Sequence, residues 1–409
     1  MSTISILVLN AGSSSIKFAC YRADAEEQRQ LCSGAVEGIG SAGRGRCWLR
    51  RADGTMLHDA ALEIADSASG LAHITQVLAT HSEFPAPQAI GHRMVSSSPE
   101  VTENQRVTPQ LIACLERYVH FAPLHTPPAL HILRHTLKAY PEVPSFIALD
   151  SWFHRDLPDV ARMLPVPASI AQLGVHRYGA HGLSYESIVD QLGTALPQRL
   201  IVAHLGNGSS ITAIRDGRSV DTSMGLTPTG GLISATRTGE IDPGVLLFLL
   251  RQAAQTAAST EDAIQTVENM VNRQSGLYGV SELSNDMRTL RRAIAEGSAK
   301  ARLAVDLYTT AIRKYIGAYI AVLGGVDMLV FTGGIGEHDA ATRAEICRGL
   351  EGLGIVLDPE QNTRTGARQI SPEGAAVVVR TMPPDEEGII VRHVLRLLQE
   401  DRQTLHPLR

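Results

Sequence analysis

The 409-residue chain lacks the features that place a protein in a specialised class at first sight. Its five cysteines are odd in number and form no Cys-x-x-Cys pair, which argues against a disulfide framework and for a reducing compartment. No apolar run approaches the roughly 20 residues that span a bilayer, and no signal-peptide pattern opens the chain. The net charge of -5 is spread without a basic stripe. We therefore expect a cytoplasmic protein that binds neither membranes nor nucleic acids.

The common nucleotide-binding and catalytic motifs are missing as well. The chain contains no Walker-type GxxxxGK[ST], no HExxH, no CxxC and no GxSxG. The segment GGIGEH, residues 333–338, follows an apolar run but lacks the full GxGxxG spacing and the acid that binds a ribose. A Walker-type loop is therefore excluded, and a dinucleotide-binding fold is only weakly supported.

What the chain does contain is three glycine-rich turns, each of which follows an apolar strand-like run. They are NAGSSS at 10–15, GNGSS at 206–210 and TGGIGE at 332–337. Such turns expose backbone N–H groups that can cradle phosphate oxygens, and Ser13, Ser14 and Ser15 add hydroxyl donors. Either of the first two alone reads equally well as a tight hairpin with a polar tip. The three together favour phosphate binding.

The length and the order of the predicted elements indicate two domains. Strands and helices alternate in both halves, and each half opens with a strand–polar turn–strand device, so we expect two related α/β domains with a ligand cleft between them. We place an N-terminal domain at 1–150, completed by a C-terminal helix at 387–409, and a nucleotide-binding domain at 151–386. Hairpins and loops are expected over 24–60, and helices over 242–257, 304–325 and 339–354.

Several cations stand in loops rather than on helix surfaces. Arg93 follows a strand, and Arg237 lies in a Gly/Thr loop before a helix, where a planar guanidinium can clamp a phosphoryl group. A solvated surface role is an equally good reading for either one alone. His125, His181 and His204 stand in loops punctuated by Gly or Pro. They could bind zinc instead, but no Cys or acid falls at the usual ligand spacing.

Acids at strand ends and helix starts could hold the Mg²⁺ that accompanies phosphates. Asp150 ends one strand, and Glu386 and Glu387 follow another. A hard cation that keeps several waters needs only one or two carboxylates. The alternative is that these are helix-start acids at the positive end of the helix dipole, a reading that fits Asp385, Glu386 and Glu387 well.

Taken together, these stretches resemble the acetate kinase family, the acetate/propionate kinases or acetokinases. The matching segments run in the family's order from one end of the chain to the other: LVLNAGSSSIKF, GHRMV, APLHTPP, ALDSWFH, HRYGAHGLS, HLGNGSS, VDTSMGLTPTGGL, TRTGEIDPG, FTGGIGE and GLEGLGI. The resemblance implies two duplicated, ribonuclease H-like α/β domains of the sugar kinase, heat-shock ATPase and actin superfamily.

The resemblance also implies a reaction, acetate + ATP ⇌ acetyl phosphate + ADP, by direct in-line transfer in a homodimer. Mg²⁺, or Mn²⁺ in its place, would be held through Asn10 and Glu386 with the help of Asp150. The implied catalytic residues are Arg93, Asp150, His181, Arg237, His125 and Asn207. The implied ATP-binding residues are Lys17, His204, Gly206, Asn207, Gly208, Asp286, Met287, Arg288, Gly334, Ile335 and His338. The acetate or other short-chain carboxylate would contact Arg93, Val95, Leu124, Ala180 and Pro228.

This chain departs from the family pattern around the acyl pocket. The family's HRVVHGG is HRMVSSSP here, which places Ser96 at an altered position, and its YGFHGTSH is YGAHGLSY. Ala180 thus replaces a large aromatic wall, and Tyr185 replaces a histidine. TPLEGLMMGTR is TPTGGLISATR, which puts Gly230 where an acid is typical, and His338 replaces an asparagine. Because the lost aromatic leaves room for methylenes worth about 0.8 kcal/mol each, we hypothesise that propionate or butyrate is accepted.

Two other classes of function stay open at this point. A kinase of the same superfamily acting on a hydroxyl would need an acid as general base, and Asp150 could serve. A nucleotide-driven regulatory or chaperone-like protein would keep the phosphate loops and lose the transfer residues. Arg93, His181 and Arg237 all remain, which argues against this last reading.

Overall fold

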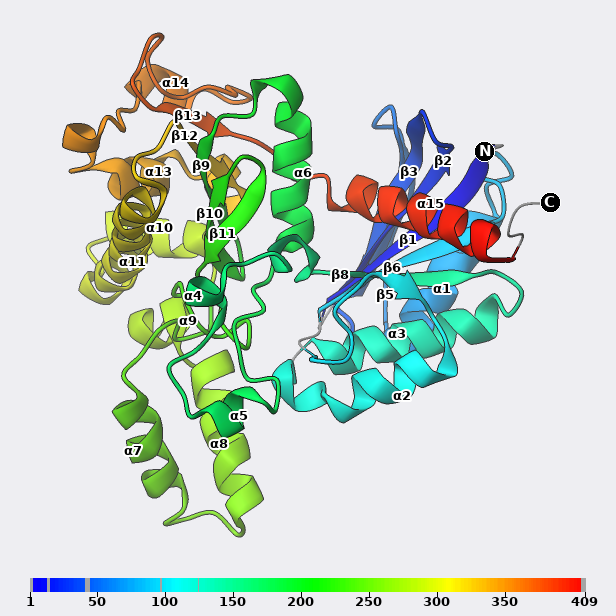
Figure 1. The fold of residues 1–409 in the computed structure, drawn as a ribbon, viewed down its shortest axis with the longest axis horizontal. Helices are drawn as coiled ribbons and strands as arrows, with labels where there is room; N and C mark the ends of the chain where they lie inside the picture. Colours follow the sequence, from blue (N-terminus) through cyan, green and yellow to red (C-terminus); the bar gives the residue numbers. More distant parts are fainter. Residues whose placement is uncertain (1–2, 13–14, 41–44, 96–97, 124, 406–409) are drawn as a thin grey trace. The chain divides into compact units, whose positions relative to one another are not determined.

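A computed structural model of the chain describes residues 3–12, 15–40, 45–95, 98–123 and 125–405. The chain forms two compact units (Figure 1). Unit 1 contains Met1–Arg155 and Asp385–Arg409, and unit 2 contains Asp156–Pro384. Glu386, which the sequence-based division placed in the second domain, thus belongs to unit 1. Within the described residues, no helix combines the length and the apolar character needed to cross a membrane.

Unit 1 is built on an eight-stranded sheet with the strand order β5-β4-β3-β2-β1-β6-β8-β7. The strands are β1 (Ile4–Ala11), β2 (Ser15–Ala23), β3 (Gln28–Glu37), β4 (Gly45–Arg51), β5 (Met56–Leu62), β6 (Ala89–Met94), β7 (Gln105–Arg106) and β8 (Ser145–Leu149). Strands β1 to β5 form an antiparallel meander, so the hairpins expected over 24–60 are regular strands. Strands β1, β6 and β8 are parallel to one another.

Helices cover both faces of the unit 1 sheet (Figure 1). They are α1 (Ser67–Ala79), α2 (Pro109–Arg117), α3 (Thr126–Ala139) and α15 (Glu386–Leu405), with short 3-10 turns at Val119–Phe121 and Trp152–His154. Leu7 and Leu9 of β1 pack with Ile74 of α1 and Ile132 of α3 in one core. Helix α15 packs against β6, β1 and β8 from the other face, so the last helix of the chain completes the first unit.

Unit 2 repeats part of this plan. Its five-stranded sheet has the order β11-β10-β9-β12-β13, formed by β9 (Arg199–Leu205), β10 (Ser209–Arg215), β11 (Arg218–Thr222), β12 (Met328–Thr332) and β13 (Val378–Thr381). Strands β9 to β11 are an antiparallel meander, and β12 and β13 continue it in parallel with β9. The same pattern appears in unit 1 as β3-β2-β1-β6-β8. This repeat is the duplicated α/β fold that the sequence predicted.

The helices of unit 2 surround a core centred on the long helix α11. They are α4 (Asp159–Arg162), α5 (Ala168–Ala171), α6 (Gly182–Leu192), α7 (Pro243–Ala253), α8 (Thr260–Arg273), α9 (Gly276–Ser281), α10 (Met287–Ala295), α11 (Ala299–Leu323), α12 (Gly333–His338), α13 (Ala340–Cys347) and α14 (Pro359–Thr363), with 3-10 turns at Gly193–Ala195 and Glu351–Leu353. Residues Val305, Tyr308 and Ile312 of α11 are fully buried against the sheet, where Ala213 and Phe331 meet them.

Candidate functional site

Three parallel strands of unit 1 end at the same edge of the sheet, and each carries a polar residue there. Leu9 of β1 pairs with His92 of β6, so the following residues, Asn10 and Arg93, lie next to each other. The pairing of Met94 with Leu149 brings Asp150, the residue after β8, to the same place. Three stretches far apart in sequence thus deliver an amide, a guanidinium and a carboxylate to one point, as the parallel register requires.

These side chains form a hydrogen-bonded cluster. Arg93 Nε and Nη2 donate to the two oxygens of Asp150 at 3.1 and 3.0 Å, and Arg93 Nη1 donates to Asn10 Oδ1 at 3.2 Å. The side chain of Asp150 is 2 % exposed and that of Arg93 is 18 % exposed. Burial disfavours the charged guanidinium, but the carboxylates of Asp150 and Glu386 outweigh it and raise the pKa of Arg93. Arg93 therefore stays a cation in a largely buried environment.

Helix α15 adds its first residue to this cluster. Asn10 Nδ2 donates to Glu386 Oε2 at 3.2 Å. The helix approaches β6 closely at Gly91, where an added Cβ would lie 2.5 Å from Ile390 and 2.9 Å from Val394. A side chain at position 91 would push α15, and with it Glu386, away from the sheet edge. We call Asn10, Arg93, Asp150 and Glu386 the edge cluster.

The carboxylates at the start of α15 are crowded. Burial, and next the charge of Glu386, raise the pKa of Glu387. Among the described residues no three Asp, Glu, His or Cys side chains come together as a complete metal site. Glu386 nevertheless keeps Oε1 without a hydrogen-bond partner among the described residues, beside the amide of Asn10. Oxygen donors around excess negative charge suit a hard cation that keeps several of its waters.

The first glycine-rich turn is the tip of the β1–β2 hairpin. Asn10 pairs with Lys17 across the two strands, and Gly12 N donates to Ser15 O at 2.8 Å. The side chain of Lys17 is exposed. Ser13 and Ser14 lie outside the described residues. The pairing of β1 with β2 therefore places a lysine beside Asn10 of the edge cluster.

The second glycine-rich turn, Gly206–Gly208, joins β9 to β10 in unit 2. Gly206 N donates to Gly208 O at 3.2 Å, and Ser209 Oγ donates to Gly206 O at the same distance. The turn is fastened to a neighbouring segment, since Ala235 N donates to Asn207 O at 3.1 Å. Gly208 borders a small space, because an added Cβ would lie 3.3 Å from His181 Nε2 and 3.5 Å from Arg237 Nη1.

A cluster of histidines and hydroxyls stands beside this turn. The rings of His181 and His204 are stacked, with centroids 4.2 Å apart and planes at 21°. Ser210 Oγ lies 2.8 Å from His181 Nδ1, and Ser184 Oγ lies 2.8 Å from His204 Nδ1. Tyr185 OH also hydrogen bonds to Ser210 Oγ. We call these five residues the histidine cluster.

The backbone explains how the histidine cluster assembles. His204 and Ser210 are register partners on β9 and β10, while the other three residues come from the start of α6. His181 caps α6 in the left-handed region, with φ 58°, a conformation that costs a non-glycine residue about 1–3 kcal/mol. Two hydrogen bonds from the first turn of α6 to the β9–β10 pair hold this conformation in place.

Arg237 is held on a scaffold made by the start of α9. Its Nη1 donates to Pro228 O at 3.1 Å. Gly276, with φ 64°, allows α9 to approach, because an added Cβ would lie 2.8 Å from Arg237 N. Leu277 N and Tyr278 N then donate to the carbonyls of Ser234 and Ala235. The structure thus brings His181, His204, Gly208 and Arg237 together in unit 2.

The residues predicted to hold the adenosine lie on two segments of unit 2. Gly334, Ile335 and His338 form the short helix α12, while Asp286, Met287 and Arg288 start α10. Asp286 caps α10: partial burial favours its neutral form, but hydrogen bonds from Arg288 and Thr289 lower its pKa on balance. Arg291 of α10 joins the two segments, since its Nε donates to Asp339 Oδ2 at 3.1 Å directly after α12.

The remaining predicted residues lie in several places. Val95 and Ala180 are buried, and Pro228 is half-buried. His125 stands just before α3 in unit 1, and Asn207 is exposed at the tip of its turn. Leu124 and Ser96 lie outside the described residues.

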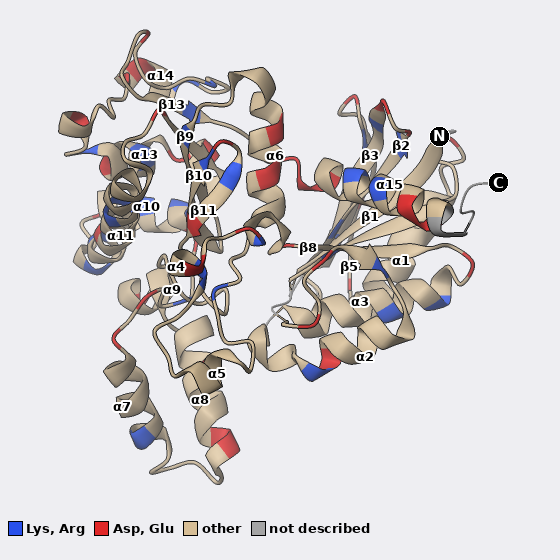
Figure 2. Ribbon diagram, viewed as in Figure 1, with Lys and Arg blue, Asp and Glu red and all other residues tan. Residues whose placement is uncertain are grey.

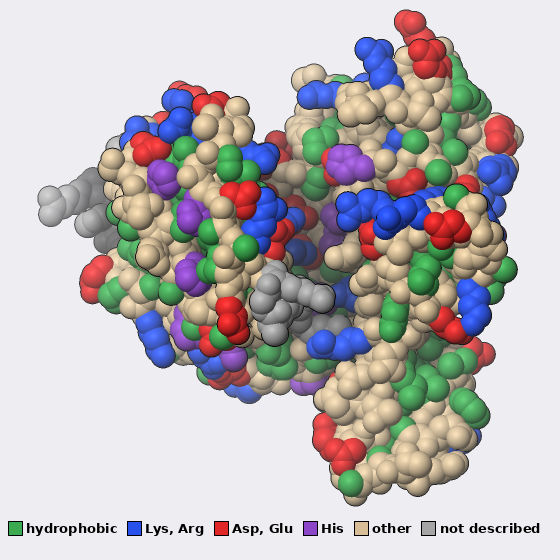
Figure 3. Space-filling model, turned by 180° about the vertical axis from the view of Figure 1, so that it is seen from behind, with side chains coloured by type: hydrophobic (Ala, Val, Ile, Leu, Met, Phe, Trp, Pro, Cys, Tyr) green, Lys and Arg blue, Asp and Glu red, His purple; other side chains and the backbone are tan. Residues whose placement is uncertain are grey.

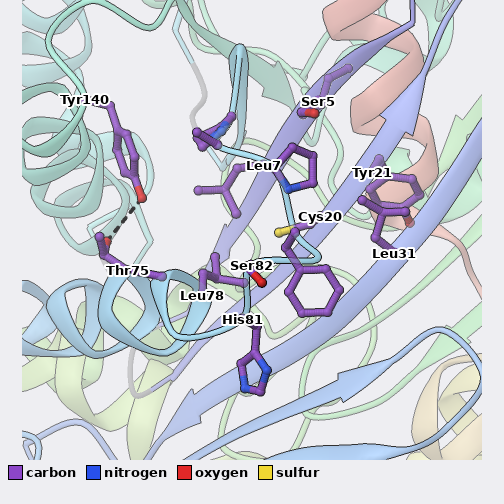
Figure 4. A pocket seen from close by; sticks show the side chains of 16 residues that line it. Ser5, Leu7, Cys20, Tyr21, Leu31, Thr75, Leu78, His81, Ser82 and Tyr140 are labelled. Carbon is purple, nitrogen blue, oxygen red and sulfur yellow. Dashed lines mark hydrogen bonds between the residues drawn. The ribbon is translucent and has the colours of Figure 1, made fainter.

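Unit 1 also contains a cavity of about 280 Å³ that none of the predicted residues lines (Figure 4). It lies at the start of β1, where Ser5 and Leu7 line it, and not at the end, where Asn10 lies. Leu78 and Cys20 contribute apolar surface, and Tyr140 donates weakly to Thr75 Oγ1 at 3.4 Å. A mostly apolar hollow that no lysine or arginine lines does not suit a phosphate.

Sequence reasoning missed several residues that build the site. Gly91, Gly276 and Arg291 position other residues, and Ser184 and Ser210 contact the two histidines. The pairing of Ser210 with His204 follows from a three-residue hairpin turn and could have been predicted. The close approaches at the two glycines involve segments far away in sequence, α15 for Gly91 and the loop at Arg237 for Gly276, so no local signal marks them.

Comparison with known proteins places these features in a wider context. The model of the acetokinase family matches residues 5–392. An acetate kinase of Rhodopseudomonas palustris is 39% identical over 407 residues, which cover 97% of this chain and 99% of that protein. The solved acetate kinase of Porphyromonas gingivalis superimposes with a TM-score of 0.81 at 33% identity, covering 97% and 100% of the two chains. A propionate kinase from Francisella tularensis reaches a TM-score of 0.85 at 30% identity, covering 96% and 100%.

Proposed function

This chain belongs to the acetokinase family, and from that premise we propose that it transfers the γ-phosphoryl group of ATP to acetate or a short-chain homologue. The products are an acyl phosphate and ADP, and the reaction is reversible. As a member of the family the chain is a phosphotransferase with a carboxyl group as acceptor. The proposals that follow assign parts of this reaction to residues.

The observation that carries the assignment is the state of Arg93 in the edge cluster. A guanidinium has five N–H groups. Arg93 uses three of them on Asp150 and Asn10, so two keep no partner among the described residues. The paired carboxylate fixes the plane of the guanidinium and leaves its remaining donors free for an anion. We assign Arg93 to the substrate carboxylate and Asp150 to the positioning of Arg93.

A carboxylate acceptor fits the state of Asp150, the residue that could have served as the general base for a hydroxyl substrate. Acetate-like acids have a pKa near the ~4.3 of glutamate and are ionised at neutral pH, so no proton has to be removed. Both oxygens of Asp150 already accept hydrogen bonds from Arg93, which disfavours this residue as the base for an alcohol. The hydroxyl-directed kinase is therefore the weaker alternative.

Unit 2 supplies donors for the phosphoryl group. His181 Nε2 and Arg237 Nη1 both face the space that Gly208 leaves open, and Asn207 lies next to it. In phosphoryl transfer the protein acts by positioning and by stabilising charge on the equatorial oxygens. We assign to His181 and Arg237 the stabilisation of that negative charge. His125 and Asn207 would assist them. The turns at Gly206–Gly208 and at Lys17 would hold the phosphates of ATP.

We propose that the adenosine of ATP binds to α12 and to the start of α10, the two segments that Arg291 joins. Gly334, Ile335 and His338 on α12 and Asp286, Met287 and Arg288 on α10 would contact the base and ribose, and His204 would lie towards the phosphates. The exposed glycine at 334 leaves the backbone open to a flat ring, while the ion pairs of Arg291 hold the two segments in place.

Mg²⁺, or Mn²⁺ in its place, is assigned to Glu386 and Asn10. The unpartnered Oε1 of Glu386 and the crowded charge beside it fit a hard cation, as described above. When bound, such a cation neutralises charge on the transferring phosphates. Asn10 keeps Glu386 at the edge of the sheet, and Gly91 lets α15 deliver it there.

We propose that the enzyme also accepts short-chain carboxylates longer than acetate. Ala180 is a buried residue with a small side chain, and the family places a large aromatic there. We propose that propionate and butyrate are used with efficiencies similar to acetate. A ratio of kcat/KM above about tenfold in favour of acetate would contradict this proposal. Replacement of Ala180 by Phe should restore the preference for acetate.

A homodimer is proposed from the apolar surface of α7 and α8. Val245, Leu247 and Phe248 on α7 are 44%, 55% and 58% exposed, and Ile264 on α8 is 40% exposed. Arg251 is the only charged residue of α7 (Figure 2), and Figure 3 shows hydrophobic side chains over the part that α7 and α8 form. Patches of this kind mark interaction surfaces. Phe248→Asp should give a monomer by light scattering, while Val160→Asp on an isolated exposed residue should not.

The cytoplasm is the proposed compartment, because ATP is the phosphoryl donor and all five cysteines are free and buried.

The activity itself is tested by trapping acyl phosphate with hydroxylamine from MgATP and formate, acetate, propionate or butyrate. Arg93→Ala and Arg237→Ala should each lower product formation by at least 100-fold. Arg106→Ala, which breaks an exposed ion pair with Asp401, is the matched control and should be fully active. No product from any acid with the wild type would overturn the proposal.

A further inference from the structure

The hydroxyl of Ser210 in unit 2 is completely buried and has two partners. His181 Nδ1 lies 2.8 Å from Ser210 Oγ, and Tyr185 OH is the second hydrogen-bonding group. Ser210 and Tyr185 are both 0 % exposed. A serine hydroxyl has one proton to donate and can accept from the other side. The direction of these two hydrogen bonds therefore decides which nitrogen of His181 carries a proton.

Three arrangements are conceivable, and two of them are unfavourable. If both Tyr185 and His181 Nδ1 donated to Ser210, the serine proton would have no acceptor, which costs about 1–3 kcal/mol in a buried place. If Ser210 donated to Tyr185, an aliphatic hydroxyl would donate to a phenol. A phenol, with a pKa near 10, is the better donor of the two. The favoured chain therefore runs from Tyr185 OH to Ser210 Oγ and from Ser210 OH to His181 Nδ1.

We infer that Tyr185 is a positioning residue, which through Ser210 holds neutral His181 in the tautomer that carries its proton on Nε2. Nε2 is the nitrogen that faces the space at Gly208, 3.3 Å from an added Cβ. The inference rests on the proposed function, in which His181 donates a hydrogen bond to the transferring phosphoryl group. In the other tautomer a lone pair would face that negative charge.

The stacked neighbour supports this arrangement. His204 lies parallel to His181, and its own Nδ1 meets Ser184 Oγ at 2.8 Å. Ser184 and Tyr185 are consecutive residues of α6, so one helical turn orients both rings. Because the rings are held from the Nδ1 side, the Nε2 side of His181 stays directed at the turn.

The first experiment measures the tautomer without substrate. Selectively ¹⁵N-labelled histidine is recorded at pH 8, and the His181 signals are assigned by their loss in His181→Asn. We expect the wild-type protein to give the nitrogen shifts of an Nε2–H tautomer. In Tyr185→Phe the shifts should move towards an average of the two tautomers. Wild-type shifts of the Nδ1–H form would overturn the inference whether or not the enzyme is active.

The second experiment measures catalysis in the same variants. Tyr185→Phe should lower kcat by roughly five- to tenfold, the value of one hydrogen bond, with KM for ATP and for the carboxylate unchanged. Tyr185→His restores a ring donor at this position and should recover part of the loss. Tyr319→Phe is the matched control, because its buried hydroxyl has no hydrogen-bond partner among the described residues. Equal kcat in Tyr185→Phe and the wild type would overturn the inference, while an inactive wild type would overturn the proposed function instead.

Discussion

The two sheets share one strand plan, yet they carry different chemistry at corresponding strand ends. In unit 1 the ends of β1, β6 and β8 carry Asn10, Arg93 and Asp150. In unit 2 the corresponding strands β9 and β12 are followed by glycine-rich segments, the turn at Gly206 and the helix α12, which starts at Gly333 where the sequence predicted a turn. In unit 2, His181 comes from the start of α6 and Arg237 from a loop, both outside the sheet, while His204 lies on β9 itself.

The difference indicates a division of labour within a duplicated fold. Unit 1 uses side chains fixed by strand register, which suits the recognition of a small charged group. Unit 2 uses exposed backbone and close approach, which suits a bulky polyphosphate. At Gly333, with φ 77°, an added Cβ would lie 2.7 Å from Leu205 O, so the glycine there is required by packing. Four substitutions test this contrast.

The largest effect is expected from Arg93→Ala in unit 1. The substitution removes the cation that we assign to the substrate carboxylate, and it breaks the ion pair between Arg93 and the buried carboxylate of Asp150. We expect kcat/KM to fall by about 100- to 1,000-fold and the free energy of unfolding to fall by about 3–5 kcal/mol. Activity assays and urea unfolding measure the two effects. The double variant Arg93→Met/Asp150→Leu should regain stability but not activity. A stable, active single variant would refute the role of the pair.

Gly208→Ala in unit 2 should affect activity alone. The added methyl group would occupy the space between His181 Nε2 and Arg237 Nη1, at 3.3 and 3.5 Å. We expect kcat/KM to fall by about 10- to 100-fold, because a misplacement of about 1 Å can cost 100-fold, with Tm nearly unchanged. Gly317→Ala on α11, which meets nothing within 4 Å, is the control and should be fully active. Its helix propensity predicts about 1 kcal/mol of added stability.

Gly91→Ala tests whether the close packing of α15 on β6 holds Glu386 in its place in the edge cluster. The methyl group would overlap Ile390 and Val394, and overpacking of this kind costs about 1–3 kcal/mol. Because α15 must shift, Glu386 should lose its contact with Asn10. We expect a lower Tm. We also expect the Mg²⁺ concentration that gives half-maximal activity to rise severalfold, measured by assaying activity against metal concentration. An unchanged Mg²⁺ requirement in a destabilised protein would separate packing from metal binding.

The smallest effect is expected from Glu387→Gln, which should change how the thermal stability of the protein depends on pH. Its pKa is raised in the folded protein by burial and then by Glu386, so the folded state binds this proton more tightly than the unfolded chain. The stabilisation is present below the ordinary pKa of glutamate and is lost as the pH rises through the raised value. Without metal, Glu387→Gln should therefore raise Tm slightly at pH 8 and not at pH 4. Exposed Glu296→Gln is the control.

Local signals predicted many elements of the fold. Asp242 caps α7 by accepting from Gly244 N at 2.6 Å, and Gly324 ends α11 with φ 67°, both as expected. The two strand–turn–strand devices are antiparallel strand pairs, β1 with β2 and β9 with β10. The helix expected over 339–354 ends earlier, at Cys347, because the following residues form turns around glycines with positive φ. Capping and turn chemistry act over a few residues, so sequence patterns reveal them.

The site was less accessible from sequence. Single positions such as Arg93 and His181 were identified, but their roles remain predictions. The contact between Arg93 and Asp150 depends on the parallel pairing of β6 with β8, and Gly91 acts on a helix at the other end of the chain. The link from Tyr185 through Ser210 to His181 joins α6 to β10. Such contacts depend on tertiary packing, which no local pattern encodes.

The completion of unit 1 by α15 has a consequence for synthesis on the ribosome. The bond between Asn10 and Glu386 joins residues 376 apart in sequence. At about 5–20 residues per second, a ribosome needs about 20–75 s to make the second partner after the first. Throughout that time the face of β6 that Ile390 and Val394 later cover has no helix on it. Unit 2 lies wholly inside the interval, so the later-encoded unit can finish folding first.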